Sequence, residues 1–122
     1  MTHPHTPHRS ISRLASVKHA LRGFKVLWAQ PNARIHCAVA VLVMTLGWLL
    51  NISSNEWLAV IVAITIVIAT EALNTAIELI VDLVSPQWQP LARDVKDVAA
   101  AAVLITSLGA AAIGFWVFVP YF

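Results

Sequence analysis

The sequence has 122 residues, a length that predicts one domain. Hydrophobic residues make up 59% and charged residues only 11%, whereas a soluble domain carries about 25% charged residues. This composition argues against a soluble domain and predicts an all-α integral membrane protein. The formal net charge is only +2, and no nucleic-acid partner is expected.

The N-terminal 29 residues divide into two segments. Residues 1–9, MTHPHTPHR, predict a disordered tail without a signal-peptide pattern. Residues 10–29 have helical periodicity, and Lys18 and Lys25 flank an apolar stripe. The stripe contains Ile11, Leu14, Val17, Leu21, Phe24 and Trp28. We expect a basic amphipathic helix on a membrane surface that contains anionic lipid.

Three membrane spans are predicted, over about 32–52, 56–84 and 94–119, within one domain of residues 10–122. Ser53 followed by Glu56 is a capping-box pattern that starts the second span. This span is roughly 43 Å long at 1.5 Å per residue, so it should project past a hydrocarbon core of about 30 Å. The segment SPQWQPLARD predicts the break before the third span, whose helix is expected to start at about Leu91 or Asp94.

The basic residues predict the orientation. All eight Lys and Arg residues lie in the N-terminal segment or in residues 85–97. The positive-inside rule therefore places the N-terminus in the cytoplasm and, with three spans, the C-terminus outside.

A row of polar residues lies in the second predicted span. At 100° per residue, Glu71, Asn74, Glu78 and Asp82 share one face about 80° wide. Glu71 lies roughly 21 Å along the helix from Trp57, still inside the apolar slab. A charge there costs about 2.5–3.5 kcal/mol and usually marks a functional site. The alternative is that these acids only pair with Arg or Lys of neighbouring helices.

The segment RDVKD follows the break and adds Lys96 and Asp97 at the same membrane interface. Carboxylates bind Mg²⁺, Mg²⁺ binds phosphates, and lysine neutralises phosphoryl oxygens. Glu71 could then act as general base toward a hydroxyl presented from the bilayer. The sequence has no Walker-type or glycine-rich loop, so side chains would have to hold a nucleotide.

The segments EALNTAIELIVDLVSP and PLARDVKDVAAAAVLI, with RG at 22–23 and PNARIH at 31–36, resemble the prokaryotic diacylglycerol kinase family, which includes undecaprenol kinases. The resemblance covers nearly the whole chain. It implies a three-span lipid kinase of the bacterial inner membrane that uses ATP and Mg²⁺. It also implies a homotrimer with active sites at the cytoplasmic interface, built partly by neighbouring subunits.

The resemblance also implies roles for single residues. Glu71 matches the general base, in contact with the lipid alcohol, and Glu78 matches a metal ligand. Arg13 corresponds to an arginine near the substrate if a one-residue gap is allowed. The residues matching the nucleotide site are Asn74, Asp82, Lys96 and Asp97, together with Gln30 and Gln89.

Two of these positions depart from the family pattern. Gln30 stands where the family commonly has a glutamate that ligates a metal, and Gln89 stands where many members have histidine. An amide oxygen can ligate Mg²⁺ but adds no charge, so weaker metal binding is expected. The pattern VDLV…PLA…KDVAA is closer to undecaprenol kinases, but the choice between undecaprenol and diacylglycerol stays open.

Two other classes of function remain open from the residues. A non-enzymatic membrane subunit with an ion path would need polar groups through the outer half of the second span, which offers only Thr65 and Thr70. A metal-dependent phosphatase or transferase would need a nucleophile. No histidine is expected near the acids, because His19 and His36 lie on other helices.

Overall fold

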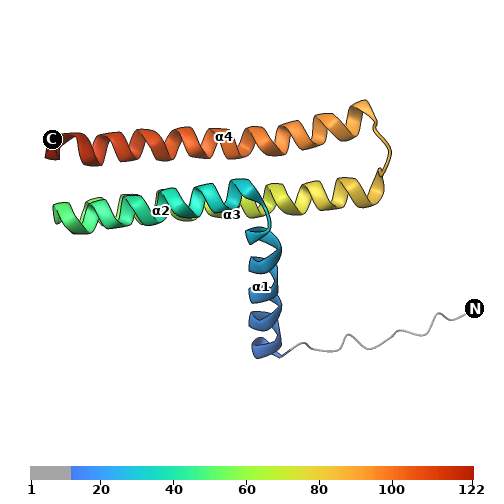
Figure 1. Cartoon of the computed structure of the whole chain (residues 1–122), viewed down its shortest axis with the longest axis horizontal. Helices are drawn as coiled ribbons and strands as arrows, with labels where there is room; N and C mark the ends of the chain where they lie inside the picture. The colour runs from blue at the N-terminus through green and yellow to red at the C-terminus, as the bar shows by residue number, and fades with distance from the viewer. Residues whose placement is uncertain (1–11) are drawn as a thin grey trace, which may run out of the picture.

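The computed structural model describes residues 12–122, so the predicted tail over 1–9 lies outside the described residues. Residues 12–122 form four α-helices and one short 3-10 helix (Figure 1). These are α1 (Arg13–Trp28), α2 (Pro31–Leu50), α3 (Ser54–Val84), α4 (Pro90–Phe118) and η1 (Val119–Tyr121). The last three α-helices are long and apolar enough to cross a membrane. The all-α class and the three candidate spans are therefore confirmed.

The turn between α2 and α3 is built as the sequence predicts. Ser53 Oγ accepts a hydrogen bond from the Glu56 backbone N–H at 3.3 Å, and Glu56 Oε2 accepts one from the Ser53 N–H at 2.8 Å. This capping box satisfies two N–H groups that a helix start leaves free. Asn51 ends α2 in the left-handed region at φ 53°, a conformation that asparagine tolerates better than most residues.

Helix α4 begins at Pro90, one residue before Leu91, the earlier of the two expected starts. Proline fits the first turn of a helix because its missing N–H would be unpaired there anyway. Gln89 precedes it in extended backbone, at φ −139° and ψ 146°. Pro90 therefore starts the helix, although the sequence pattern placed it in the break.

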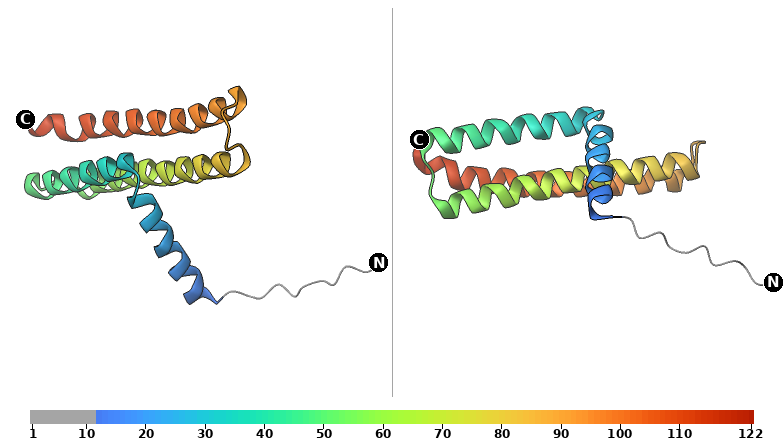
Figure 2. Two further views of the ribbon diagram at one scale, coloured as in Figure 1. Left: turned by 45° about the vertical axis from the view of Figure 1, so that its right-hand side comes forward. Right: turned by 90° about the horizontal axis from the view of Figure 1, so that it is seen from below.

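The three long helices lie side by side, and α3 and α4 extend beyond α2 toward the loop of residues 85–89 (Figures 1 and 2). Helix α3 has 31 residues, which is about 46 Å at 1.5 Å per residue. Its final turns can therefore project past a hydrocarbon core of about 30 Å. We call the end with residues 51–53 and the C-terminus the turn end, and the end with residues 85–89 the loop end.

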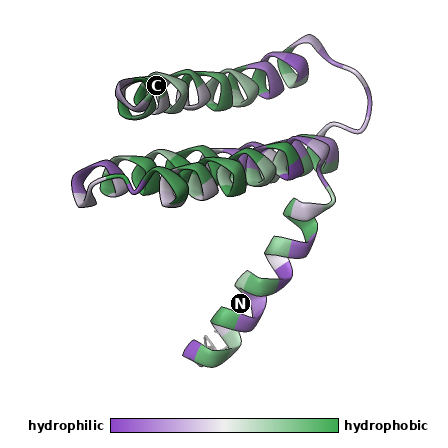
Figure 3. Cartoon of the chain, turned by 60° about the vertical axis from the view of Figure 1, so that its left-hand side comes forward, coloured by the Kyte–Doolittle hydropathy of each residue, from purple (hydrophilic) through white to green (hydrophobic). Residues whose placement is uncertain are grey.

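Helix α1 points away from the three long helices (Figure 1). Figure 3 shows hydrophilic and hydrophobic residues alternating along it, whereas the long helices are mainly hydrophobic. Leu14, Leu21 and Phe24 of its apolar stripe are exposed. An apolar stripe without protein cover is typical of a helix that lies in a membrane interface.

The best-packed part of the bundle lies at the turn end. Ile52, Val60, Val117 and Phe118 form a buried cluster that joins α3 to α4. Gly47 permits the close approach of α2, because a Cβ there would lie 3.0 Å from Ile52 Cδ1. Contacts that tight leave no room for a larger residue without displacement.

Candidate active site

Three polar side chains are buried in the part of α3 nearer the loop end. Glu71, Asn74 and Thr75 are only 2%, 6% and 4% exposed. Since α3 is continuous, Glu71 and Asn74 share a face with Glu78, which is half-buried. Helix α3 thus turns these groups toward protein and away from the surrounding medium.

Most of the hydrogen-bonding capacity of this buried group is unused. Asn74 Nδ2 donates to Glu78 Oε1 at 3.2 Å. Within residues 12–122, Glu71 Oε2, Asn74 Oδ1 and Thr75 Oγ1 are buried and have no hydrogen-bond partner. A buried polar atom without a partner costs about 1–3 kcal/mol. Such atoms, clustered on one helix, are typical of a site that a ligand completes.

A histidine lies beside this group, contrary to the sequence-based expectation. His36 Nε2 on α2 lies 3.7 Å from Glu71 Oε2 on α3. The expectation that no histidine lies near the acids was wrong because it treated the helices separately. His36 lies sixteen residues before Ile52 and Glu71 lies nineteen after it, so an antiparallel hairpin brings them together. Counting from the predicted turn would have found the pair.

A second cluster lies at the loop end, between the end of α3 and the start of α4. A cavity of about 250 Å³ is lined mostly by polar residues, and its apolar lining residues are Val81, Pro86, Trp88 and Ala92. Four of the polar lining residues are predicted nucleotide-binding residues: Asp82, Gln89, Lys96 and Asp97. The fold therefore brings residues from both sides of the break into one cavity.

Lys96 and Asp82 form an ion pair across this cavity. Lys96 Nζ lies 2.5 Å from Asp82 Oδ1, and their side chains are 38% and 63% exposed. Exposed ion pairs contribute only about 0–1 kcal/mol. Lys96 can therefore exchange Asp82 for another anion at little cost.

Two predicted site residues have no place in these clusters. Arg13 is the first residue of α1, at the end of that helix farthest from the bundle (Figure 2). Gln30 precedes α2 and is half-buried, and its side chain forms no capping hydrogen bond there. Within one chain, Arg13 therefore does not lie near Glu71.

The donor groups near Glu78 fit a magnesium–nucleotide complex better than a metal site made by protein alone. No group of three His, Cys, Asp or Glu side chains that could hold a metal occurs in the described part of the chain. Mg²⁺ at nucleotide sites is usually held by one or two carboxylates together with substrate phosphates. Glu78 supplies one carboxylate, and the unpartnered Asn74 Oδ1 supplies a neutral oxygen.

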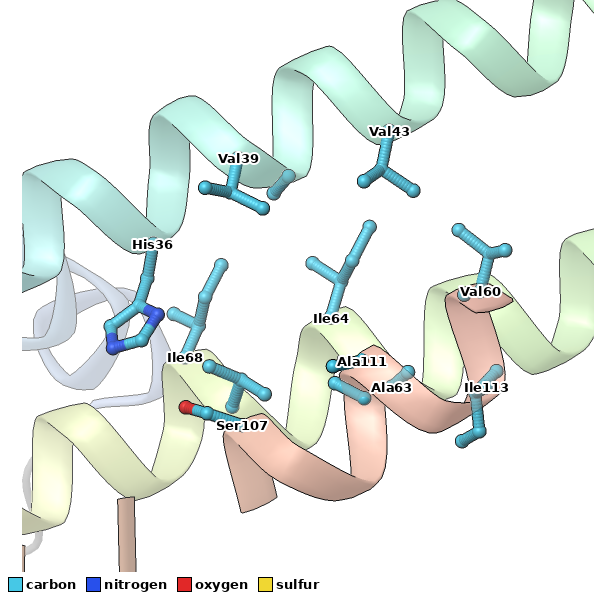
Figure 4. Close-up of a pocket in the computed structure, with 14 residues that line it drawn as sticks. His36, Val39, Val43, Val60, Ala63, Ile64, Ile68, Ser107, Ala111 and Ile113 are labelled. Carbon is cyan, nitrogen blue, oxygen red and sulfur yellow. The ribbon is translucent and has the colours of Figure 1, made fainter. Parts of the chain in front are cut away.

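An apolar pocket of about 230 Å³ lies between α2, α3 and α4 (Figure 4). His36 and Ser107 are its polar lining residues, and the others are apolar. Figure 4 shows His36 projecting from α2 near Ile68 of α3. The pocket has the composition of a site for hydrocarbon.

The chain resembles known proteins over most of its length. The family model for prokaryotic diacylglycerol kinase matches residues 18–118. An undecaprenol kinase from Bacillus subtilis is 37% identical over 106 residues, which is 86% of each chain. A diacylglycerol kinase from Synechocystis is 35% identical over 88% of this chain and 62% of that protein. One from Haemophilus influenzae is 31% identical over 74% of this chain and 77% of that protein.

Proposed function

The chain belongs to the prokaryotic diacylglycerol kinase family, and on that premise we propose that it transfers the γ-phosphoryl group of ATP to undecaprenol. Members of the family are lipid kinases, so the protein is a lipid kinase. The finer choice of undecaprenol is supported by the pattern VDLV…PLA…KDVAA and by the similarity to the B. subtilis enzyme. Diacylglycerol is the second candidate substrate.

The observation that carries the mechanism is the burial of Glu71 with an unpartnered carboxylate oxygen. In the proposed reaction, Glu71 removes the proton from the lipid hydroxyl. The alcohol oxygen then forms a bond to the γ-phosphorus, and the bond to the ADP leaving group breaks. A positioned general base of this kind contributes about 10²–10⁴-fold to a rate.

The loop-end cavity is the proposed site of the nucleotide phosphates. Lys96 would leave Asp82 and neutralise phosphoryl oxygens, while Asp97 and Gln89 line the same cavity. Glu78 would hold Mg²⁺ with Asn74 or Gln30. When bound, the ion would neutralise charge on the phosphates. Trp88 lies on the cavity wall, where an adenine could stack.

We further propose a homotrimer in the bacterial inner membrane, with the loop end in the cytoplasm and the C-terminus outside. The basic residues of α1, together with Arg93 and Lys96 near the start of α4, support this orientation. Arg13 lies away from Glu71 of its own chain, so a neighbouring copy would have to supply this arginine to a site. Many large apolar side chains of α2, α3 and α4 are exposed, and lipid and further copies would cover them.

The alternative of an ion-conducting subunit gains no support from Thr65 and Thr70 of α3. Thr65 Oγ1 donates to the Ile61 carbonyl at 2.8 Å, and Thr70 Oγ1 donates to the Ile66 carbonyl at 2.7 Å. Both hydroxyls are therefore bonded within their own helix and do not extend the row of acids toward the turn end.

The direct test is transfer of labelled phosphate from ATP in mixed micelles, with undecaprenol and diacylglycerol offered together. The proposal predicts labelled undecaprenyl phosphate as the main product. Phosphatidic acid as the main product would keep the kinase mechanism and overturn the choice of substrate. Absence of labelled lipid from both substrates would overturn the proposed function.

A further inference from the structure

We propose that His36 is a positioning residue that acts through Glu71 and receives the proton that Glu71 takes from the lipid alcohol. This inference rests on the proposed function, since it requires Glu71 to act as the general base. It gives α2 a role in the reaction, although no residue of α2 was predicted to act as an acid or a base.

The geometry places the imidazole where Glu71 needs a partner. His36 Nε2 and Glu71 Oε2 are 3.7 Å apart, slightly beyond hydrogen-bond length. Glu71 Oε2 has no hydrogen-bond partner among residues 12–122. A small rotation of either side chain would bring the two atoms within bonding distance. With the imidazole proton on Nδ1, Nε2 can accept a hydrogen bond from the Glu71 carboxyl once that group has gained a proton.

The two side chains differ in their exposed fractions. The side chain of Glu71 is 3% exposed, and that of His36 is 23% exposed. A carboxylate buried to this degree cannot pass its proton directly to bulk water, so each turnover requires a neighbouring acceptor. His36 reaches from the buried oxygen to the surface of the bundle and meets this requirement.

The other groups around Glu71 do not offer the same route. Glu78, two turns further along α3, accepts a hydrogen bond from Asn74. Ser107 of α4 lines the same apolar pocket as His36 but is not a base at neutral pH. His36 is thus the base positioned for this transfer.

The proton balance of the step is simple. The lipid O–H bond breaks as Glu71 gains the proton, and the alcohol oxygen bonds to phosphorus as ADP leaves. The proton then moves from the Glu71 carboxyl to His36 Nε2, and the imidazolium releases a proton to water. Glu71 is again a carboxylate and His36 is again neutral, so the pair is ready for another turnover.

The test compares His36→Gln with wild type and with His19→Gln, the same change at an exposed position of α1. Glutamine retains hydrogen bonding but carries no proton. We expect His36→Gln to lower kcat by about 10–100-fold and to leave KM for ATP and lipid within about twofold. The pH dependence of kcat should differ between wild type and His36→Gln, because glutamine accepts no proton, and it should be the same in wild type and His19→Gln.

A second variant covers the case in which His36→Gln does not fold. His36→Ala leaves a gap that free imidazole can enter, so added imidazole should restore part of its kcat. The inference is overturned if wild type is active and His36→Gln matches its kcat and pH profile. It is also overturned if a folded His36→Ala gains nothing from imidazole. A wild-type chain inactive on both lipids would instead remove the proposed function itself.

Discussion

The two ends of the bundle are built in opposite ways. At the turn end, apolar side chains form a buried cluster, Gly47 allows close packing, and the capping box satisfies the start of α3. Tyr121 Oη donates to Glu56 Oε2 at 2.6 Å and ties the C-terminus to α3. At the loop end, the helices hold buried polar atoms without partners and a cavity crossed by an exposed ion pair.

The difference shows how one set of helices separates stability from function. Packed apolar groups and satisfied hydrogen bonds stabilise the turn end whether or not a ligand is present. The unpartnered atoms of Glu71, Asn74 and Thr75 destabilise the loop end by about 1–3 kcal/mol each. Binding of nucleotide, metal and lipid hydroxyl would relieve part of this cost. Substitutions at the two ends should therefore affect different measurements.

The largest effect is expected from Glu71→Gln. Glutamine keeps the shape of the side chain and loses the base, so kcat should fall by about 10²–10⁴-fold. Helix content by circular dichroism and assembly by size exclusion should match wild type. A folded variant with wild-type kcat would contradict the role of Glu71, and loss of assembly would favour a purely structural role.

Lys96→Met should give the next largest effect, on nucleotide binding. Loss of the ammonium removes a charge-assisted contact to phosphate, worth about 1.5–3 kcal/mol or roughly 10–150-fold in KM for ATP. The melting temperature should change little, because the Lys96–Asp82 pair is exposed. Lys18→Met is the matched control, since Lys18 is exposed on α1 and does not line this cavity. An unchanged KM in Lys96→Met would show that the cavity does not bind the phosphates.

Gln30→Glu tests whether residue 30 takes part in metal binding at the loop end. If Gln30 lies at the metal, a carboxylate there adds negative charge. The lipid kinase rate should then reach half its maximum at a lower Mg²⁺ concentration. Titrating the lipid kinase rate with Mg²⁺ measures this shift in both chains. Asn55→Asp, an exposed change of amide to carboxylate at the turn end, should leave the midpoint unchanged. Identical curves for wild type and Gln30→Glu would remove Gln30 from the metal site.

Gly47→Ala tests the opposite end and should leave the chemistry unchanged. The added Cβ would meet Ile52 and Trp57 at 3.0–3.2 Å, and overpacking of this kind costs about 1–3 kcal/mol. The melting temperature should fall, while kcat of the folded enzyme stays at the wild-type value. Gly109→Ala is the control, because no atom of the chain lies within 4 Å of its added Cβ. Equal melting temperatures for the two variants would contradict close packing at Gly47.

The sequence predicts local features of this fold better than the contacts between helices. The apolar runs predict three spans, and Ser53 with Glu56 predicts the start of α3, because both signals lie within one segment. The pattern placed Pro90 in the break although it begins α4, since proline can begin a helix as well as break one. The His36–Glu71 contact was missed because it depends on how α2 pairs with α3. The placement of Arg13 depends on further copies of the chain and stays a prediction.

The most direct measurement is a structure of the full chain in a lipid bilayer with Mg²⁺ and a non-hydrolysable ATP analogue. Our account predicts phosphates against Lys96 in the loop-end cavity, and oxygen or metal partners at Asn74 Oδ1 and Glu78. It also predicts that Glu71 faces the protein interior beside His36. A nucleotide bound elsewhere, or a Glu71 side chain that points into the lipid, would contradict it.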